Sequence, residues 1–413
     1  MSTLSLDSHT FDPRATGTLL ADFDRLLELI GDRGLALSPK HAFAAPSLEA
    51  INQRLTKPVR LGLKRAMQKS YPVIGGLYLL LRASGLGQID AVAKPPRLVL
   101  DPKMMSAWSA LNDTERYFAL LKAWWGRGNN ALIGERTSWG GDMTTQVIDF
   151  AKQCLTRGCP RIEHQDALVG LRYRPGVVNL ALLELFGLFE IQVMPPEEGQ
   201  GWRPSAITLT PWGQALLSTV LDARNPARTP ETAALAAALA LDWLFDPIAA
   251  FEDWSHSIRP ALPEWQQDLV SPEADFQPGA HQFKVSLGAR CWRRVRCGGE
   301  TDLAELASTI LIAFDFDEDH LYRFSYQNRY GQTVEIDHSD LVEETDNAVA
   351  DAVRIGELSL TEGQRIEFLF DFGDDWRFEI VAERPEPGPA PLTPLILESH
   401  GEAPAQYGDD WDD

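Results

Sequence analysis

The chain has 413 residues, more than one hydrophobic core usually supports, so its length predicts two or three domains. Hydrophobic residues make up 44% of it, the share of an ordinary globular protein. The sequence holds no apolar run long enough to cross a bilayer, and its first residues lack the pattern of a secretory signal. We therefore expect no membrane association and a cytoplasmic location.

Charge divides the chain near its middle. Residues 1–230 hold 26 Lys and Arg against 21 Asp and Glu, a net charge of +5. Residues 231–413 hold 12 against 38, a net charge of −26. Because an acidic surface repels nucleic acid, any contact of that kind is expected in the front half.

Apolar residues in the front half recur at helical spacing. This spacing covers residues 18–31, 78–86, 111–125 and 143–156. We therefore predict a multidomain protein with a mainly α N-terminal half. Its expected parts are a helical region over residues 1–97 and a helical, winged-helix-like domain over residues 98–230.

Positive charge in the front half is concentrated in one segment, which contains Arg54, Lys57, Arg60, Lys64, Arg65 and Lys69. Lys and Arg supply most of the sequence-independent affinity of proteins for nucleic acid. This segment is therefore the candidate nucleic-acid contact. The alternative is that these side chains form the solvated face of a helix.

Residues 175–222 follow the order helix, strand, turn, strand, helix. Gly187 ends the first helix, and Thr210 with Pro211 has the features that begin the second. This order, with the pattern "LLELFGLFEI…ITLTPWGQALL", resembles the wing end of a winged helix, a fold that binds DNA or docks proteins. The turn carries Glu197, Glu198 and only one cation, Arg203, so a structural or protein-contact role is favoured.

Residues 231–279 are expected to connect the two halves. An Ala- and Leu-rich helix is predicted over 231–246 and a proline-rich linker over 260–278. Residues 385–413 are rich in Pro and then acidic, which predicts a loose tail. The cysteines fall into two pairs, Cys154 with Cys159 and Cys291 with Cys297, without zinc spacing, and are expected to be buried thiols.

Residues 280–384 show the pattern of an α+β domain with a mostly antiparallel sheet on one main helix. Strands are predicted over 281–287, 292–297, 321–326, 365–370 and 377–381. Thr301 is the expected cap of a helix that runs to about Phe314.

The segments "HQFKVSL", "CWRRVRC", "LAELASTILIAFDFDEDHLYRF" and "FLFDFGDDWRFEI" in this region resemble the plasmid pRiA4b ORF-3-like family. The resemblance covers about residues 281–383. It implies a family without an established activity, some of whose members are labelled as passenger proteins of an insertion sequence. Members often end in a Cys-containing segment, whereas residues 395–401 here contain no cysteine.

An acidic cluster with one histidine is the candidate site of this domain: Asp317, Asp319, His320, Asp371, Asp374 and Asp375. Carboxylates with an imidazole suit a divalent metal that activates water. The alternative is structural: Asp374 and Asp375 cap a tight turn, and Asp319 pairs with Arg293 or Arg294. Trp292 and Trp376 are expected in the core rather than stacked on a base.

Two functions from different classes follow from these features. The first is a non-enzymatic interaction or regulatory protein without a cofactor or catalytic residue. It has a protein partner, and its front half offers the surface for nucleic acid or for another protein. The alternative is a metal-dependent hydrolase or nuclease that uses the Asp/His cluster. A mobile-element or toxin–antitoxin accessory role is suggested by the family resemblance alone.

Overall fold

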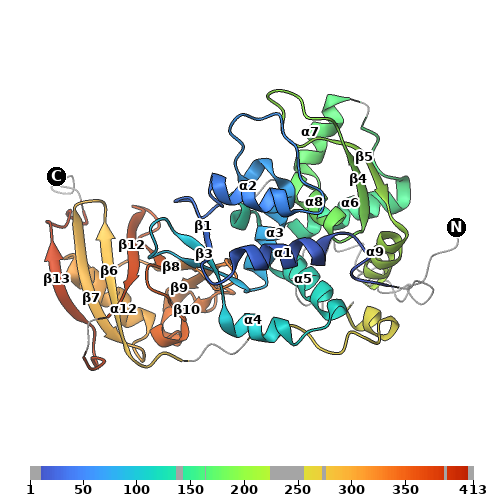
Figure 1. Cartoon of the computed structure of the whole chain (residues 1–413). Helices are drawn as coiled ribbons and strands as arrows, with labels where there is room; N and C mark the ends of the chain where they lie inside the picture. The colour runs from blue at the N-terminus through green and yellow to red at the C-terminus, as the bar shows by residue number, and fades with distance from the viewer. Residues whose placement is uncertain are drawn as a thin grey trace. The chain divides into compact units, whose positions relative to one another are not determined.

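The computed structural model describes residues 11–135, 143–162, 164–223, 255–271, 276–385 and 388–407. The chain divides into two compact units (Figure 1). The N-terminal unit comprises Met1–Ile89 and Pro95–Ser271, and the C-terminal unit comprises Asp90–Lys94 and Pro272–Asp413. The helix predicted over 231–246 lies outside the described residues.

The N-terminal unit is mainly helical, as predicted. Its described helices are α1 (Leu19–Ile30), α2 (Ala45–Arg54), α3 (Pro72–Ala83), α4 (Pro102–Ser109), α5 (Asp113–Arg127), α6 (Met143–Arg157), α7 (Gln165–Tyr173), α8 (Val177–Leu185) and α9 (Pro211–Ala223). One small sheet has the strand order β1 (Leu35–Ala36), β3 (Arg97–Leu100), β2 (Gly87–Asp90). A second pairs β4 (Phe189–Val193) with β5 (Pro204–Leu209). Both sheets lie at the edges of the helices (Figure 1).

Helices α3 and α8 pack closely against each other at the centre of this unit. The sequence of α3 is apolar on all sides, and every residue of α8 except Val177 and Glu184 is buried. Gly75 and Gly76 permit the close approach, because a Cβ atom at Gly76 would lie 3.0 Å from the side chain of Leu182. The two helices therefore have no face left for solvent.

Three hydrogen bonds tie the aromatic core to the helices around it. The indole of Trp124 donates to Asn179 at 3.1 Å, which links α5 to α8. The hydroxyl of Tyr117 donates to the carbonyl of Phe186 at 2.7 Å and accepts from the indole of Trp212 at 2.9 Å. Because each buried polar atom has a partner, these large side chains stay in the core without an unpaired polar group.

Residues 255–271 belong to the N-terminal unit, whereas part of this stretch was predicted to be linker. Trp265 is buried and stacks on Phe118 with ring centres 4.1 Å apart. The carboxylate of Glu115, in the first turn of α5, accepts from the backbone N–H groups of Gln266 and Gln267. The high proline content led to the prediction of a linker, although Trp265 attaches this stretch to the core.

The C-terminal unit is built on one eight-stranded sheet in the order β10-β9-β8-β11-β12-β6-β7-β13. All pairs are antiparallel except β10 with β9, which confirms the predicted α+β fold. The strands are β6 (Ala280–Leu287), β7 (Cys291–Gly298), β8 (Tyr322–Gln327), β9 (Thr333–Asp337), β10 (Ala348–Val349), β11 (Arg365–Phe370), β12 (Trp376–Glu383) and β13 (Leu395–His400). Helix α12 (Leu303–Ala313) buries Leu306, Ile310 and Leu311 in the core of this unit.

The helix cap and the tail differ from expectation. The cap of α12 is Asp302, one residue beyond the predicted Thr301, and its side chain accepts from the N–H of Glu305. Residues 395–400, predicted to lie in a loose tail, form β13, which pairs with β7. Prolines and carboxylates on either side of this short strand dominate the composition of residues 385–413, so composition alone did not predict the strand.

We predict opposite outcomes for alanine at two neighbouring glycines of α3. Alanine favours a helix interior by about 1 kcal/mol over glycine. At Gly75 the added Cβ would lie 3.4 Å from Val178, so Gly75→Ala should be neutral or slightly stabilising. At Gly76 it would lie 3.0 Å from two atoms of buried Leu182, and overpacking costs roughly 1–3 kcal/mol, so Gly76→Ala should destabilise. Urea denaturation followed by circular dichroism measures both, and equal stabilities would contradict the close packing.

Candidate functional site

The six cations predicted to contact nucleic acid all lie on one exposed segment, residues 54–69, which we call the basic segment. Arg54 ends α2, and the rest of the segment is irregular apart from a short 3₁₀ turn at Gln68–Ser70. The side chains of Arg54, Lys57, Arg60, Lys64, Arg65 and Lys69 are exposed. The alternative of a solvated helix face therefore does not apply beyond Arg54.

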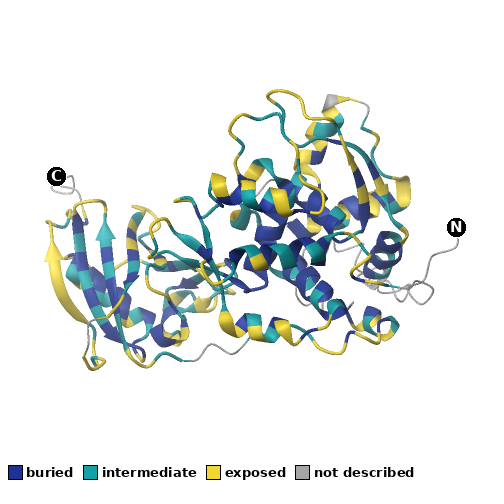
Figure 2. Cartoon of the chain, viewed as in Figure 1, coloured by how far each residue is buried: buried dark blue, intermediate teal, exposed yellow. Residues whose placement is uncertain are grey.

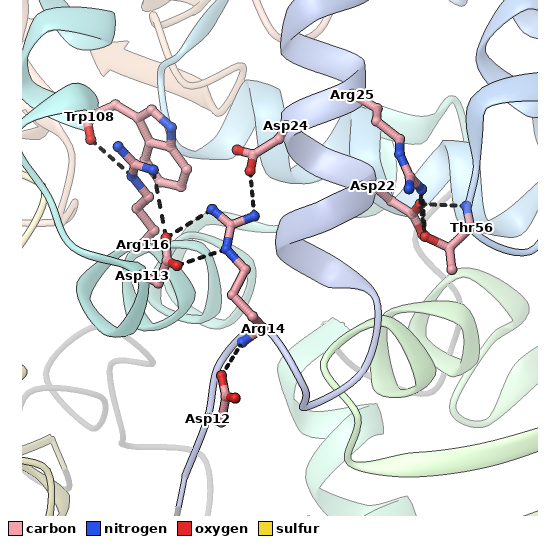
Figure 3. A network of polar contacts seen from close by, with 9 residues as sticks. All are labelled: Asp12, Arg14, Asp22, Asp24, Arg25, Thr56, Trp108, Asp113 and Arg116. Atoms are coloured by element: carbon pink, nitrogen blue, oxygen red, sulfur yellow. Dashed lines mark hydrogen bonds and ion pairs between the residues drawn. The ribbon is translucent and has the colours of Figure 1, made fainter.

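Two polar contacts anchor the first part of the basic segment. Asp22 on α1, only 2% exposed, accepts from the N–H and the hydroxyl of Thr56 at 2.6 and 2.7 Å (Figure 3). Arg25 donates to the same hydroxyl and to Asp22. The side-chain amide of Asn52 both donates to and accepts from the backbone of Val59, at 3.0 and 2.9 Å.

The same helix is held from its other side. Arg14, from the segment before α1, donates to Asp24 on α1 and to both carboxylate oxygens of Asp113 on α5 at 2.7–2.9 Å (Figure 3). These bonds raise the pKa of the Arg14 guanidinium and lower the pKa of Asp113. Helix α1 is therefore held by Arg14 through Asp24, and it in turn holds Thr56 of the basic segment through Asp22.

The second part of the basic segment docks on the turn between β4 and β5. Gly62 donates to the carbonyl of Gln200 at 3.1 Å and accepts from the N–H of Gly199 at 3.0 Å. The approach is so close that a Cβ atom on Gly62 would overlap the carbonyl of Glu197. Beyond this point, buried Gln68 accepts from the N–H of Phe43 at 2.7 Å. The basic segment is thus held at four places.

Few of the cations of the basic segment are neutralised. Lys57 pairs with Glu184 at 2.9 Å, and Lys64 pairs with Glu198 at 3.2 Å, both through exposed ammonium groups. In the described ranges, Arg54, Arg60 and Arg65 form no ion pair with an acidic side chain. The two acidic residues of the turn are both engaged, since Glu197 pairs with Arg203 at 2.7 Å.

The elements predicted over residues 175–222 are present in the expected order, as α8, β4, β5 and α9. Thr210 caps α9 by accepting from the N–H of Gly213 at 2.8 Å. A recognition helix must present an open face to the major groove. Buried α8 has none, so the winged-helix resemblance is not confirmed and a groove-binding role for α8 is disfavoured.

The acidic cluster of the C-terminal unit is only partly brought together. Asp371 and Asp375 enclose the tight turn between β11 and β12, and both have positive φ values, +55° and +59°. The side chain of Asp371 accepts from the N–H groups of Gly373 and Asp374. Asp375 pairs with Arg377 at 2.7 Å. The side chain that caps the turn is therefore that of Asp371, whereas the structural alternative named Asp374 and Asp375 as its caps.

Asp319 and His320 lie beside this turn, with side chains that are 47% and 40% exposed. His320 is 3.4 Å from Asp371 and 3.8 Å from Asp319. Tyr407 and Gln406 both donate hydrogen bonds to Asp319, and the side-chain Oε1 of Gln406 accepts from the N–H of Asp317 at 2.5 Å. The bond from Tyr407 lowers the pKa of Asp319 and raises that of Tyr407 to about 12.

Arg293 and Arg294 do not reach the cluster, contrary to the expected pairing with Asp319. Arg293 is buried and donates to the carbonyls of Ala313, His400 and Gly401. Arg294 pairs with Glu383 at 2.7 Å and with Glu398. Trp292 and Trp376 are half-buried; Trp376 packs on Phe316, and Trp292 stacks on His400.

Some structural residues of this unit carry no signal in the sequence. Asp337 is fully buried and accepts from Arg323, Thr345 and Asn347 at 2.5, 2.6 and 2.9 Å. Burial raises the pKa of Asp337, but these hydrogen bonds outweigh it, so the pKa is lowered. Gln406 and Tyr407 were likewise missed, because they lie 87 and 88 residues from Asp319.

The cluster shows no metal-binding arrangement. Within the residues that the structure describes, no three His, Cys, Asp or Glu side chains are grouped so that they could hold a metal ion. All four cysteines are free thiols; Cys154, Cys291 and Cys297 are buried as expected, whereas Cys159 is only half-buried. No described helix is long and apolar enough to span a membrane.

We predict that Asp319→Asn lowers the pKa of Tyr407 from about 12 toward the ordinary tyrosine value of about 10. The folded state favours neutral Tyr407, so stability from this bond is present below pH 10 and is lost as pH rises toward 12. The ¹³C shift of the Tyr407 ring in an NMR titration measures this. Asp317→Asn is the control and should lower the pKa less; equal shifts would contradict the direct bond.

Comparison with known proteins found similarity for the C-terminal unit. Residues 280–410 match the family model described as plasmid pRiA4b ORF-3-like protein. Among solved structures, MM3350 from Methanosarcina mazei Go1, a protein of unknown function, is similar over 30% of this chain and 70% of its own, with 20% identity and a TM-score of 0.26. No curated protein matches the chain. The resemblance predicted for residues 281–383 is thereby confirmed: the C-terminal unit is similar to the pRiA4b ORF-3-like family.

Proposed function

We propose that the chain is a non-enzymatic binding protein whose N-terminal unit contacts duplex nucleic acid through the basic segment. The observation that carries this proposal is the exposure of six cations, of which Arg54, Arg60 and Arg65 lack an acidic partner among the described residues. An exposed guanidinium without a partner is available to a phosphate, and it loses no internal ion pair on binding.

The electrostatic surroundings favour this contact. Residues 50–89 contain seven Lys and Arg and no Asp or Glu, so the basic segment is the centre of a longer stretch without negative charge. The pair of Lys64 with Glu198 is exposed on both sides, and pairs of this kind contribute little to stability. In the other pair the Lys57 ammonium is exposed, whereas the Glu184 side chain is only 16% exposed. A polyanion can therefore replace the carboxylate of Glu198 at small cost.

The anchoring of the segment also supports binding. A flexible loop loses conformational entropy when a ligand fixes it, and that loss weakens affinity. The contacts at Thr56, Val59, Gly62 and Gln68 already hold the backbone of the basic segment. Most of the conformational entropy of the basic segment is thus already lost on folding and is not lost again on binding.

The C-terminal unit is proposed to act through a protein partner of opposite charge. Residues 280–413 hold 11 Lys and Arg against 29 Asp and Glu, a net charge of −18. Such a surface attracts a basic partner and repels nucleic acid. The protein would act in the cytoplasm, where its free thiols stay reduced, and an accessory role in a mobile element is the setting that the family resemblance suggests. The metal-dependent hydrolase has no support from the arrangement of Asp319, His320 and Asp371.

We predict that Arg60→Gln with Arg65→Gln in the full chain weakens binding to a fluorescent 20-base-pair duplex. Each lost phosphate contact should reduce the slope of log affinity against log salt by about 0.9, so the slope should fall by about 2. Fluorescence anisotropy between about 50 and 200 mM salt measures it. The matched control is Arg33→Gln with Lys40→Gln, which removes two exposed cations outside the basic segment.

The control variant should keep the wild-type slope. If the wild-type chain binds the duplex no better at low than at high salt, the nucleic-acid proposal fails. If both double variants weaken binding equally, the basic segment is not the contact, and only net charge matters.

We predict a different signature for Asn52→Ala, which removes both hydrogen bonds to Val59 and leaves every cation in place. The freed backbone must be ordered on binding, so affinity should fall by roughly three- to tenfold, about 1 kcal/mol. The salt slope should stay unchanged, because the number of phosphate contacts is the same. The same anisotropy titrations test this, and a changed slope would show that Asn52 does more than position the segment.

A further inference from the structure

Strand β13 forms one end of the C-terminal sheet and is open along its length. In the part of the chain that the structure describes, β13 pairs with β7 alone. All six of its residues are exposed, as the outermost strand of this unit in Figure 2 shows. Leu395, Ile396 and Leu397 are 47%, 43% and 41% exposed.

The apolar side chains of β13 lie on both faces of the sheet. Leu395 is opposite Arg296, and Ile396 is opposite Val295, whose side chain is buried in the core. Because neighbouring residues of a strand point to opposite faces, Leu395 and Ile396 are exposed on different sides. Leu392, just before the strand, is 98% exposed. A strand that presents backbone groups and apolar side chains at an open edge is a template for pairing with another strand.

The charges near β13 indicate what can pair with it. The C-terminal unit is strongly acidic as a whole, which opposes contact between two copies. Beside β13, however, β7 and the turn before it carry Arg290, Arg293, Arg294 and Arg296. The one carboxylate of β13, Glu398, is already paired with Arg294. This edge is therefore not acidic, and repulsion between two copies is weak there, whereas a basic partner has no reason to choose it.

We propose that β13 pairs with β13 of a second copy of the chain, antiparallel about a two-fold axis near Ile396. Leu397 is the extra residue of a β-bulge against β7, so the ladder between the two copies is irregular at that position. The axis near Ile396 brings the two Ile396 side chains together and sets Leu395 of each copy near Leu397 of the other. Each of these apolar residues then gains an apolar neighbour in the other copy, and a closed two-fold pair leaves no open edge at this end of the sheet. A shift by one residue toward the C-terminus is disfavoured, because it would set Leu395 opposite Glu398.

A six-residue strand provides a small interface, below the roughly 1,600 Å² of a standard one. We therefore expect a dissociation constant in the micromolar range. The dimer needs no nucleic acid, so it is independent of the function proposed for the basic segment, and the two proposals can fail separately.

Analytical ultracentrifugation of the full chain at several concentrations, without nucleic acid, tests this proposal. Leu395→Glu with Leu397→Glu sets like charges opposite each other and should weaken the dimer by at least about tenfold. Glu at position 395 lies next to Arg296, so the fold of each copy should be kept, as circular dichroism checks. The matched control is Val342→Glu with Phe372→Glu, which adds the same charge at apolar side chains that are 61% and 46% exposed elsewhere in the unit.

A wild-type chain that stays monomeric up to about 100 µM overturns the proposal. Equal weakening by both double variants also overturns it, since net charge would then explain the loss. Protection of β13 from hydrogen exchange at high protein concentration, lost on dilution, supports it. Protection that appears only on addition of another protein would mean that the edge binds a different partner.

Discussion

The close packing of α3 against α8 decides which surfaces of the N-terminal unit are available. Gly75 and Gly76 let the two backbones approach, and each helix then buries nearly all of its residues. Helix α8, which would contact the DNA groove in a winged helix, is thereby buried in the core. The surface available for binding therefore comes from the irregular segments around the core. Among these segments, the basic segment combines positive charge with a fixed backbone.

Fixed backbone in an irregular segment requires buried polar anchors, and the N-terminal unit supplies them from regular elements. Asp22 is nearly inaccessible on α1, yet both of its contacts with Thr56 and its contact with Arg25 satisfy it. Gly62 meets the β4–β5 turn through backbone bonds alone, which no larger residue permits. The acidic turn thus serves as a support: Glu198 holds Lys64, and Glu197 is neutralised by Arg203.

Sequence patterns predicted the positions of helices and strands, which depend mainly on residues close together in the chain. The helical spacing of Leu19, Phe23 and Ile30 places α1 within one residue, and strand alternation places β6, β7 and β12. Contacts between distant residues were not predictable. Asp319 was expected to pair with Arg293 or Arg294, but the side chains that bind it are those of Gln406 and Tyr407. The exposure of Arg60 and Arg65 was predicted; the anchoring that makes it useful was not.

Composition misled most where a short apolar run lies among prolines and carboxylates. Leu395–Leu397 spans three residues, too few to offset the acidic tail around it in any average, yet it completes the edge of an eight-stranded sheet. The guanidinium of Arg293, on β7, donates to the carbonyls of His400 and Gly401 and fixes the end of β13. A buried cation on one strand thus specifies the position of another a hundred residues later. The arginine-rich strand that positions β13 also lowers the negative charge of the unit at this edge, and it thereby sets the electrostatic conditions under which a second acidic copy can approach.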